Sequence, residues 1–460
     1  MAATATPRAP FSRGARARQR AFRHPGYVVL AGFLATIGVG TILLLLPISA
    51  ADGRQTSFVD ALFTATSAIT TTGLDTVNGP AHWSNFGDGV IAVLIQIGGL
   101  GILTSASLFF MVVAHRIGLR RRLATQMEVR ADALGGLRQL VLVILKVAVL
   151  VELTVALALT ATFWLRYDER FLTALWHGGF HSISAFNNAG TTLFPDGLDR
   201  FAGDPFVLVP LIVGCTIGAL GFPVWAELWR RRGPVARWSI HTKLTLVTTA
   251  VMVSLGTLAF LAFEWTNPQT IGRGNIAERL LDGVFSGVMP GTSGFGVFDY
   301  ADIGQESLFV SDILMFVGGG SGGTAGGLKV ATVALLMLVV WAELRGDQQV
   351  TAFRRAIPQT IQRQALTIAT LLMGAVTLGT LGLMTVTDEQ LGIALSVVIA
   401  AISTAGMSLD LQDELTTAAK MILIPLMLLG RIGPLALGSM LILRDRQRRY
   451  AEPEERIMVV

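Results

Sequence analysis

The sequence predicts an all-α membrane protein with eight transmembrane helices arranged in four parallel repeats. Of its 460 residues, 52% are hydrophobic and only 15% are charged, and the mean hydropathy is +0.60. Soluble proteins carry about 25% charged residues. Many apolar runs are long enough to cross a bilayer, which needs about 20 residues per helix. In addition, a short apolar segment that ends near a glycine recurs four times.

Eight long apolar runs supply the predicted spans. They lie at 27–49, 89–113, 140–164, 206–228, 244–263, 308–342, 365–386 and 418–443. Between the two runs of each successive pair lies a shorter segment, near 57–69, 171–186, 277–289 and 389–402. Segments of this length are too short to span and are typical of re-entrant helices. Such backbone must line a water-filled cavity or be buried in protein.

Clusters of arginine orient the predicted spans. They occupy the N-terminal arm, the connections after the second, fourth and sixth spans, and the C-terminal tail. The alternate connections are acidic or sparse in cations, and the last of them has five acidic residues before its first cation, Lys420. By the positive-inside rule, the arginine-rich segments lie in the cytoplasm. We therefore expect a multi-pass protein of the bacterial plasma (inner) membrane with both termini cytoplasmic.

The predicted organisation alternates repeats with basic cytoplasmic segments. The repeats are 27–113, 140–229, 244–342 and 365–443. The cytoplasmic segments are an N-terminal arm at 1–26, connections at 114–139, 230–243 and 343–364, and a tail at 444–460. Each repeat consists of a helix, a pore loop and a second helix. All four enter the membrane in the same orientation, so they are related by an axis along the membrane normal and surround a central pore.

Four short segments after the re-entrant helices are the candidate ion-binding filter. They read TSAITTTGL at 66–74, SAFNNAGT at 184–191, MPGTSGF at 289–295 and AISTAGM at 401–407, and their glycines lie 117, 104 and 112 residues apart. Four copies suggest a ring, and rings of backbone carbonyls select alkali cations. The predicted filter residues are Thr71, Thr72, Gly73, Asn188, Ala189, Gly190, Thr292, Ser293, Gly294, Thr404, Ala405 and Gly406.

Glycine suits such a ring because inward-facing carbonyls require backbone angles that a Cβ atom disfavours. The re-entrant helices would point their partially negative C-termini towards a cation. No ring of carboxylates occupies these positions, which favours a monovalent ion over calcium. A glycine that merely caps a helix is the common alternative for one copy. Four copies at matching places favour the filter.

A glycine-rich tract interrupts the sixth apolar run and is the candidate gate. Residues 318–327 read GGGSGGTAGG, with seven glycines. Each glycine costs a helix about 1 kcal/mol relative to alanine. We therefore expect two half-helices joined by a flexible intramembrane loop beneath the filter; a helix-packing surface of small residues is the alternative. The predicted gate residues of this region are Gly318, Gly319, Gly320, Ser321, Gly322, Gly323, Thr324, Gly326, Gly327 and Lys329.

Arg431 lies inside the last apolar run and completes the candidate gate. It follows the fourth filter glycine by 25 residues, and the glycine tract follows the third by 24, so the two should lie at similar depth. A buried arginine costs at least about 2.5–3.5 kcal/mol on insertion scales and normally has partners. Its five donors suit the loop carbonyls and Thr324. Lys329 would extend the positive field.

Other classes of function fit the sequence less well. The spans contain no HExxH motif, paired aspartates or Ser/His arrangement, so we do not expect an enzyme. A Na⁺- or H⁺-coupled carrier with alternating access remains the alternative, but only Glu152 offers the titratable intramembrane group that such carriers usually use. The single cysteine, Cys215, excludes an internal disulfide and is expected to be packed inertly. The net charge of +5 reflects the basic flanks of the spans, so we expect lipid rather than nucleic acid around them.

The eight-span plan, together with SAFNNAG, GTSGF, GGSGGTAGGLK and GRIGPL, resembles the Trk/Ktr/HKT superfamily of cation transporters. Within it, the chain is most similar to KtrB-type subunits, because it lacks the extra N-terminal helix pair of TrkH proteins. The resemblance implies potassium uptake through one pore per subunit, with K⁺ bound at the filter residues. In plant HKT relatives a serine at the first filter glycine goes with sodium preference, so Gly73 implies potassium.

The resemblance also implies partners. These are a second copy of the chain in a homodimer and a cytoplasmic ring of RCK domains, like that of KtrA or KtrC, which would carry the only nucleotide. Na⁺ is left open as an activator. The chain departs from its relatives at Gly291, where arginine is common, and at Thr191, where an aromatic residue is usual. The tail YAEPEERIMVV is similar to tails that contribute to the dimer interface in relatives.

Overall fold

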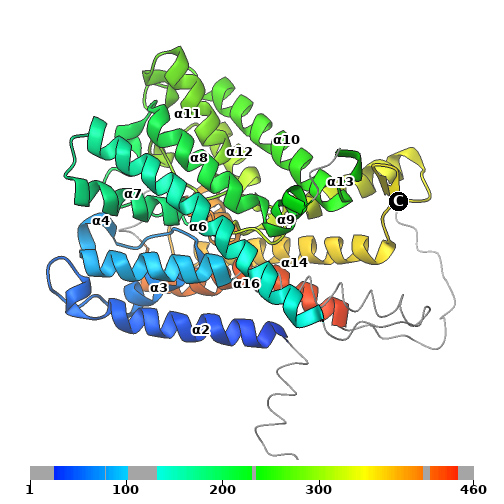
Figure 1. Ribbon diagram of the computed structural model, residues 1–460, viewed down its shortest axis with the longest axis horizontal. Helices are drawn as coiled ribbons and strands as arrows, with labels where there is room; N and C mark the ends of the chain where they lie inside the picture. Colours follow the sequence, from blue (N-terminus) through cyan, green and yellow to red (C-terminus); the bar gives the residue numbers. More distant parts are fainter. Residues whose placement is uncertain (1–24, 78, 102–131, 231–234, 408–414, 444–460) are drawn as a thin grey trace, which may run out of the picture.

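A computed structural model describes residues 25–77, 79–101, 132–230, 235–407 and 415–443. Within these ranges the chain is almost entirely helical, and its helices pack into one bundle (Figure 1). The first described helix lies against the last one, so the two ends of the described chain meet. The predicted tail 444–460 and almost all of the predicted arm 1–26 lie outside the described residues.

The helices fall into four units, each with a short helix between longer ones. Unit 1 has α2 (Pro25–Leu44), α3 (Phe58–Thr70), α4 (Gly79–His82) and a helix at Asn85–Gly101. Unit 2 has α6 (Asp132–Arg166), α7 (Phe171–Phe186), α8 (Pro205–Leu220) and α9 (Phe222–Arg230). Unit 3 has α10 (Ile240–Phe263), α11 (Ile276–Val288), α12 (Gln305–Phe316) and α13 (Val330–Arg345). Unit 4 has α14 (Gln359–Met384), α15 (Leu391–Ser403) and α16 (Thr417–Leu443).

The remaining elements are short. Strands β1 (Val317–Gly318) and β2 (Leu328–Lys329) form a parallel pair, and β3 (Thr351–Ala352) and β4 (Arg355–Ala356) form a two-residue hairpin. Single 3₁₀ turns lie at Pro47–Ser49, Asp199–Phe201, Val235–Arg237, Ile271–Arg273 and Tyr300–Asp302. Several long helices begin inside the predicted cytoplasmic connections; α6, for example, begins at Asp132. Helices thus continue past the apolar runs that predicted them.

The short helices α3, α7, α11 and α15 coincide with the predicted re-entrant segments. Their starts follow from local sequence: Ser57 caps α3 through Asp60 N, and Asn275 and Glu278 form a capping box at α11. Their C-terminal halves are buried almost all round, as in α15, where every residue from Ser396 to Ser403 is buried. Burial on every side places these halves among other helices and away from lipid and water. Each therefore ends in the interior of the bundle.

Two of the expected spans are broken in the structure. The run 206–228, predicted as one span, bends by 94° between α8 and α9. The bend is at Gly221, whose φ of 87° is unfavourable for residues with a Cβ, and Pro223 follows it. The run 308–342 is divided into α12 and α13, as the glycine tract predicts.

Three described helices are long and apolar enough to cross a bilayer, at Val141–Arg166, Ile240–Phe263 and Gln359–Met384. The bent pair in unit 2 raises this count to four. The outer helices expose their apolar residues. In the most apolar 18-residue stretch of each helix, only 17% of the residues are buried in Val141–Arg166 and only 11% in Ile240–Phe263. Such surfaces are stable against lipid and not against water. The bundle is therefore a multi-pass membrane protein.

The units interlock through their short helices. The second helix of one unit packs on the short helix of the next: α8 on α11, α12 on α15, and α16 on α3. The last of these contacts joins unit 4 to unit 1. This arrangement brings the four segments that follow the short helices to the middle of the bundle.

Candidate functional site

The four predicted filter segments share one backbone feature. Their glycines all have positive φ angles, with values of 81° at Gly73, 70° at Gly190, 75° at Gly294 and 60° at Gly406. Such angles favour glycine over any other residue. The residue two positions earlier is also left-handed in three segments, at Thr71, Asn188 and Thr404. Three of the four segments thus leave their helices in similar conformations, although their sequences differ.

The four segments form a closed ring. A Cβ atom added to each filter glycine would overlap the backbone oxygen of the residue that precedes the glycine of the next unit. The overlaps are Gly73 with Ala189 O, Gly190 with Ser293 O, Gly294 with Ala405 O and Gly406 with Thr72 O. The chain of contacts runs from unit 1 through units 2 and 3 to unit 4 and returns to unit 1. The ring is therefore made of backbone in direct contact, with room only for glycine.

The third segment differs from the other three. In units 1, 2 and 4 the residue before the glycine donates its N–H to the carbonyl five residues back, as Ala189 does to Ser184 at 2.8 Å. In unit 3, the N–H groups of Thr292, Ser293 and Gly294 all donate to Met289 O. Proline at 290 has no N–H, so α11 ends earlier and the segment closes on Met289. MPGTSGF is therefore the segment with the distinct backbone.

The surroundings of the ring suit a dehydrated alkali cation. Thr71, Thr72, Asn188, Ser293 and Thr404 are fully buried. The hydroxyl oxygens of Thr71 and Thr404 have no hydrogen-bond partner among the described residues. All four short helices end at the ring, so their partially negative C-termini face it. Neutral oxygens in a negative potential attract a cation without carrying a charge themselves.

The glycine tract of unit 3 is an ordered loop at the ring. Its ends pair as β1 and β2, with Val317 opposite Leu328. The middle is fastened to the end of α8, because Gly320 N donates to Ala219 O at 2.8 Å and Thr324 N donates to Gly218 O at 3.1 Å. Gly318, Gly319, Gly320, Gly322, Gly323, Gly326 and Gly327 are buried, and Ser321 and Lys329 are half-buried.

Thr324 joins this loop to both the filter and Arg431. Its hydroxyl hydrogen-bonds to Asn188 Oδ1 and donates to Phe186 O at 3.1 Å, so it touches the second filter segment. Arg431 Nη1 donates to Thr324 O, and the arginine is only 4% exposed. Lys329 Nζ donates to Ala325 O at 2.5 Å and thus binds its own loop. The structure brings the predicted filter, loop and Arg431 together.

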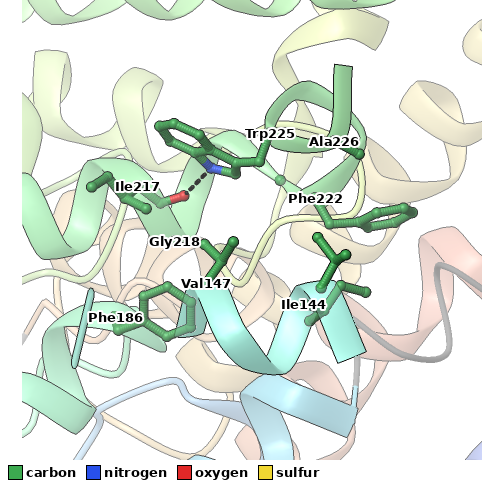
Figure 2. A pocket seen from close by; sticks show the side chains of 10 residues that line it. Ile144, Val147, Phe186, Ile217, Gly218, Phe222, Trp225 and Ala226 are labelled. Carbon is green, nitrogen blue, oxygen red and sulfur yellow. Dashed lines mark hydrogen bonds between the residues drawn. The ribbon is translucent and has the colours of Figure 1, made fainter. Parts of the chain in front are cut away.

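The bend between α8 and α9 in unit 2 contacts the glycine loop of unit 3. Phe222 N donates to Gly322 O at 3.3 Å, directly after the bend. Beside it, a small apolar pocket lies between α6 and the α8–α9 bend (Figure 2). Trp225 Nε1 donates to Ile217 O at 2.9 Å across the bend and holds it closed (Figure 2).

Two polar residues next to the filter were not predicted as site residues. Asn187 is fully buried at the end of α7 and contacts Gln96 and Glu152. Cys215, expected to be inert, accepts a hydrogen bond at its backbone oxygen from Asn188 Nδ2 at 3.0 Å, and its Sγ lies 3.3 Å from Ser293 Oγ. The sequence could have indicated Asn187, because it lies next to the predicted filter residue Asn188 in SAFNNAG. No local pattern singles out Cys215, because its partners come from other segments.

Comparison with known proteins agrees with this geometry. A family model for TrkH, described as cation transport protein, matches residues 1–445. The chain is 38% identical over 413 residues to the Ktr system potassium uptake protein B of Bacillus subtilis (strain 168), covering 89% of this chain and 91% of that protein. It is 34% identical over 443 residues to the potassium/sodium uptake protein NtpJ of Enterococcus hirae, covering 95% and 97%.

The fold is also similar to a solved structure. The crystal structure of the potassium transporter TrkH from Vibrio parahaemolyticus aligns with a TM-score of 0.69 and 20% identity, over 92% of this chain and 85% of that one. At that identity the likeness concerns the fold alone. The family model, by contrast, covers nearly the whole sequence, and both relatives exceed 30% identity over most of their length. The chain therefore belongs to the TrkH family of cation transport proteins.

Proposed function

We propose that this chain is the channel-like, potassium-translocating subunit of a bacterial K⁺ uptake system. The observation that carries the proposal is the closed ring of four glycine segments, one from each unit. Two relatives of high coverage are named as potassium or potassium/sodium uptake proteins. In this proposal K⁺ binds the backbone and hydroxyl oxygens of the four filter segments, with Na⁺ as a candidate activator.

The ring also supports the full architecture of eight spans in four parallel repeats around one pore. The four units each supply one short helix and one glycine, and each packs on the next. In unit 3 the second predicted span is broken by the glycine tract, and in unit 2 it is bent at Gly221. Both termini would then be cytoplasmic, in keeping with their arginines.

The gate in this proposal is the loop 318–329 together with Arg431. Its support is the hydrogen bond from Arg431 to Thr324 and the contacts of Thr324 with the second filter segment. A cation at that depth repels K⁺ below the filter, and movement of the loop would remove the obstruction. The Bacillus subtilis relative is named as protein B of a Ktr system, which supports a KtrA-like partner for this chain. The proposal adds that the chain forms a homodimer and that this partner is a cytoplasmic, nucleotide-binding ring.

Rubidium uptake tests the proposed function. A bacterium deficient in potassium uptake should grow at low K⁺ and accumulate Rb⁺ when it expresses this chain. The same cells without the chain provide the baseline, and membrane fractions should show that the chain is present. Failure to grow or to take up Rb⁺, with the chain present in the membrane, would contradict the proposal.

The filter assignment has a separate test in Gly73→Ser. The new Cβ would overlap Ala189 O and displace the ring where unit 1 meets unit 2. We expect the ratio of K⁺ to Na⁺ uptake to fall relative to the unaltered chain. An unchanged ratio in cells that still take up Rb⁺ would show that Gly73 does not line the filter.

A further inference from the structure

We propose that Glu152, in α6 of unit 2, is a positioning residue for the second filter segment and helps set cation selectivity. This inference rests on the proposed function, because selectivity presupposes that the ring conducts cations. Glu152 lies in a helix that crosses the bilayer, where carboxylates are rare and costly. Its partners account for its presence there.

The carboxylate of Glu152 accepts hydrogen bonds from two amides. Gln96 Nε2 lies 2.9 Å and 3.2 Å from its two oxygens, and Asn187 Nδ2 lies 3.4 Å from Oε1. The backbone oxygen of Glu152 also accepts from Ser182 Oγ, on the helix that carries the filter segment. One residue of α6 thus contacts unit 1 and two positions of α7.

Asn187 connects Glu152 and Gln96 to the second filter segment. It caps the end of α7, and its Nδ2 also donates to Gln96 Oε1 at 2.8 Å and to Ile183 O at 3.0 Å. The next residue, Asn188, is the left-handed filter residue that contacts Thr324. Asn187 is fully buried, and Gly99 packs so closely on its amide that a Cβ there would overlap Oδ1. A shift of Asn187 therefore has to move Asn188.

The equivalent positions in the other units are held differently. In unit 1 the equivalent residue is Thr70, whose hydroxyl bonds within its own segment to Thr66 O and Thr72 Oγ1, both at 2.7 Å. In unit 4 it is Ser403, whose hydroxyl has no partner among the described residues. Unit 3 has glycine at this position, residue 291. The second filter segment is thus the one fastened to a carboxylate, among the parts of the chain that the structure describes.

A carboxylate suits this place because it accepts hydrogen bonds and donates none. Glutamine at 152 would keep one oxygen for Gln96 and Asn187, but its NH₂ group would face the NH₂ group of Gln96. Alanine would remove both acceptor oxygens of residue 152, so Gln96 Nε2 would lose its carboxylate partner. Asn187 Nδ2 would lose one of its three acceptors and keep Gln96 Oε1 and Ile183 O. A lost hydrogen bond in an apolar region is costly. The two substitutions should therefore disturb the filter to different degrees.

The test is the ratio of Rb⁺ to Na⁺ uptake by the full-length chain reconstituted in liposomes. We expect Glu152→Ala and Gln96→Leu each to lower the ratio by about fivefold, the factor for a hydrogen bond of ordinary strength. Glu152→Gln should fall between these variants and the unaltered chain. Thr154→Ala is the matched control, because Thr154 is exposed on the same helix and its hydroxyl donates to Leu150 O within that helix.

The outcomes separate this inference from the proposed function. No Rb⁺ uptake by the unaltered chain would contradict the proposed function, whereas uptake with an unchanged ratio in Glu152→Ala would overturn the role of Glu152. An equal loss of ratio in Thr154→Ala would also overturn it. If Glu152→Ala fails to fold, Gln96→Leu and Asn187→Ala decide the matter by the same ratio. Gly73→Ser shows that the assay detects a change of selectivity.

Discussion

At the scale of single residues, the filter glycines are determined by contact as well as by backbone angle. A positive φ alone is a weak restriction, since Thr71, Asn188 and Thr404 also adopt it. The stronger restriction is that the place of a Cβ is already occupied by the carbonyl oxygen of the neighbouring unit. Alanine at these positions would therefore push two units apart.

This reasoning predicts that Gly190→Ala lowers the rate of Rb⁺ uptake by about tenfold, because the added Cβ displaces one segment of the ring. Gly73→Ser should lower the rate similarly and leave enough uptake for its selectivity to be measured. The control is Gly179→Ala in α7, the helix that precedes Gly190, where an added Cβ meets nothing within 4 Å. Gly179→Ala should transport at the unaltered rate. The measurement is the initial rate of Rb⁺ uptake, corrected for the amount of chain in the membrane. Normal transport by Gly190→Ala would contradict the contact argument.

At the scale of elements, broken helices place the loop at the filter. The break in unit 3 is readable in the sequence, since seven glycines in ten residues cannot sustain a helix. The bend in unit 2 is not, because a lone Gly221 before Phe222 and Pro223 is compatible with a continuous apolar run. The loop nevertheless depends on that bend, since α8 supplies the carbonyls that hold it.

The gate proposal predicts that Arg431→Ala raises the rate of Rb⁺ uptake. The substitution removes the hydrogen bond to Thr324 O and a positive charge below the ring. A hydrogen bond to a charged group contributes about 1.5–3 kcal/mol, so we expect an increase of about tenfold. Arg345→Ala is the control, because Arg345 is exposed and packs on Trp341 at 4.9 Å. An unchanged rate in Arg431→Ala, or in a chain lacking residues 319–323, would contradict the gate.

A second prediction at this scale concerns Glu264, which links the end of α10 to α12. Burial raises the pKa of its carboxyl, but hydrogen bonds from Ser307 Oγ, Gly304 N at 2.8 Å, and Asn267 and Thr270 outweigh burial. The pKa therefore lies below its ordinary value of 4.5. A carboxyl whose pKa is lower in the folded chain than in the unfolded chain stabilises the fold at any pH above its pKa in the unfolded chain. This stabilisation is lost as the pH falls through its pKa in the folded chain.

Thermal unfolding in detergent measures this effect. At pH 7, Glu264→Gln should unfold at a lower temperature than the unaltered chain. The glutamine NH₂ group is a donor and would face groups that are themselves donors, on Asn267, Thr270, Gly304 and Ser307. The difference should shrink as the pH falls below 4.5, where the carboxyl becomes protonated. A difference that stays constant down to low pH would show that the charge of Glu264 is not what stabilises this turn.

At the scale of the whole molecule, polar contacts close the four-unit ring. Each joins the second helix of one unit to the short helix or filter of the next. The pairs are Gln96–Asn187 at 2.8 Å, Cys215–Ser293 at 3.3 Å, Asp312–Ser396 at 2.8 Å and Lys420–Asp60 at 2.7 Å. The residue types differ at every junction, so sequence comparison among the units does not reveal them. The last pair joins residues 360 positions apart.

Lys420→Met tests this closure. It leaves the carboxylate of Asp60 largely buried, with 19% of that side chain exposed, and without its cation. Breaking a fully buried pair costs about 3–5 kcal/mol, and this partly buried pair should cost less than that but more than an exposed one, so we expect a fall in the midpoint of thermal unfolding in detergent. Arg54→Ala is the control, because the Arg54–Asp52 pair is 88% and 58% exposed and should contribute less than about 1 kcal/mol. Equal midpoints for both variants would contradict the closure.

The sequence by itself determined the membrane class, the four short helices, the four glycines that follow them and the position of the glycine tract. These follow from local properties, namely the length of apolar runs, the spacing of glycines and the charge of connections. Only the tertiary structure decided which unit touches which, the bend at Gly221, and the contacts of Asn187, Glu152 and Cys215. Each of these depends on a partner from another unit, and low identity among the units hides that pairing. The physical reason is that helix formation is local, whereas a ring is closed by contacts between residues far apart in the chain.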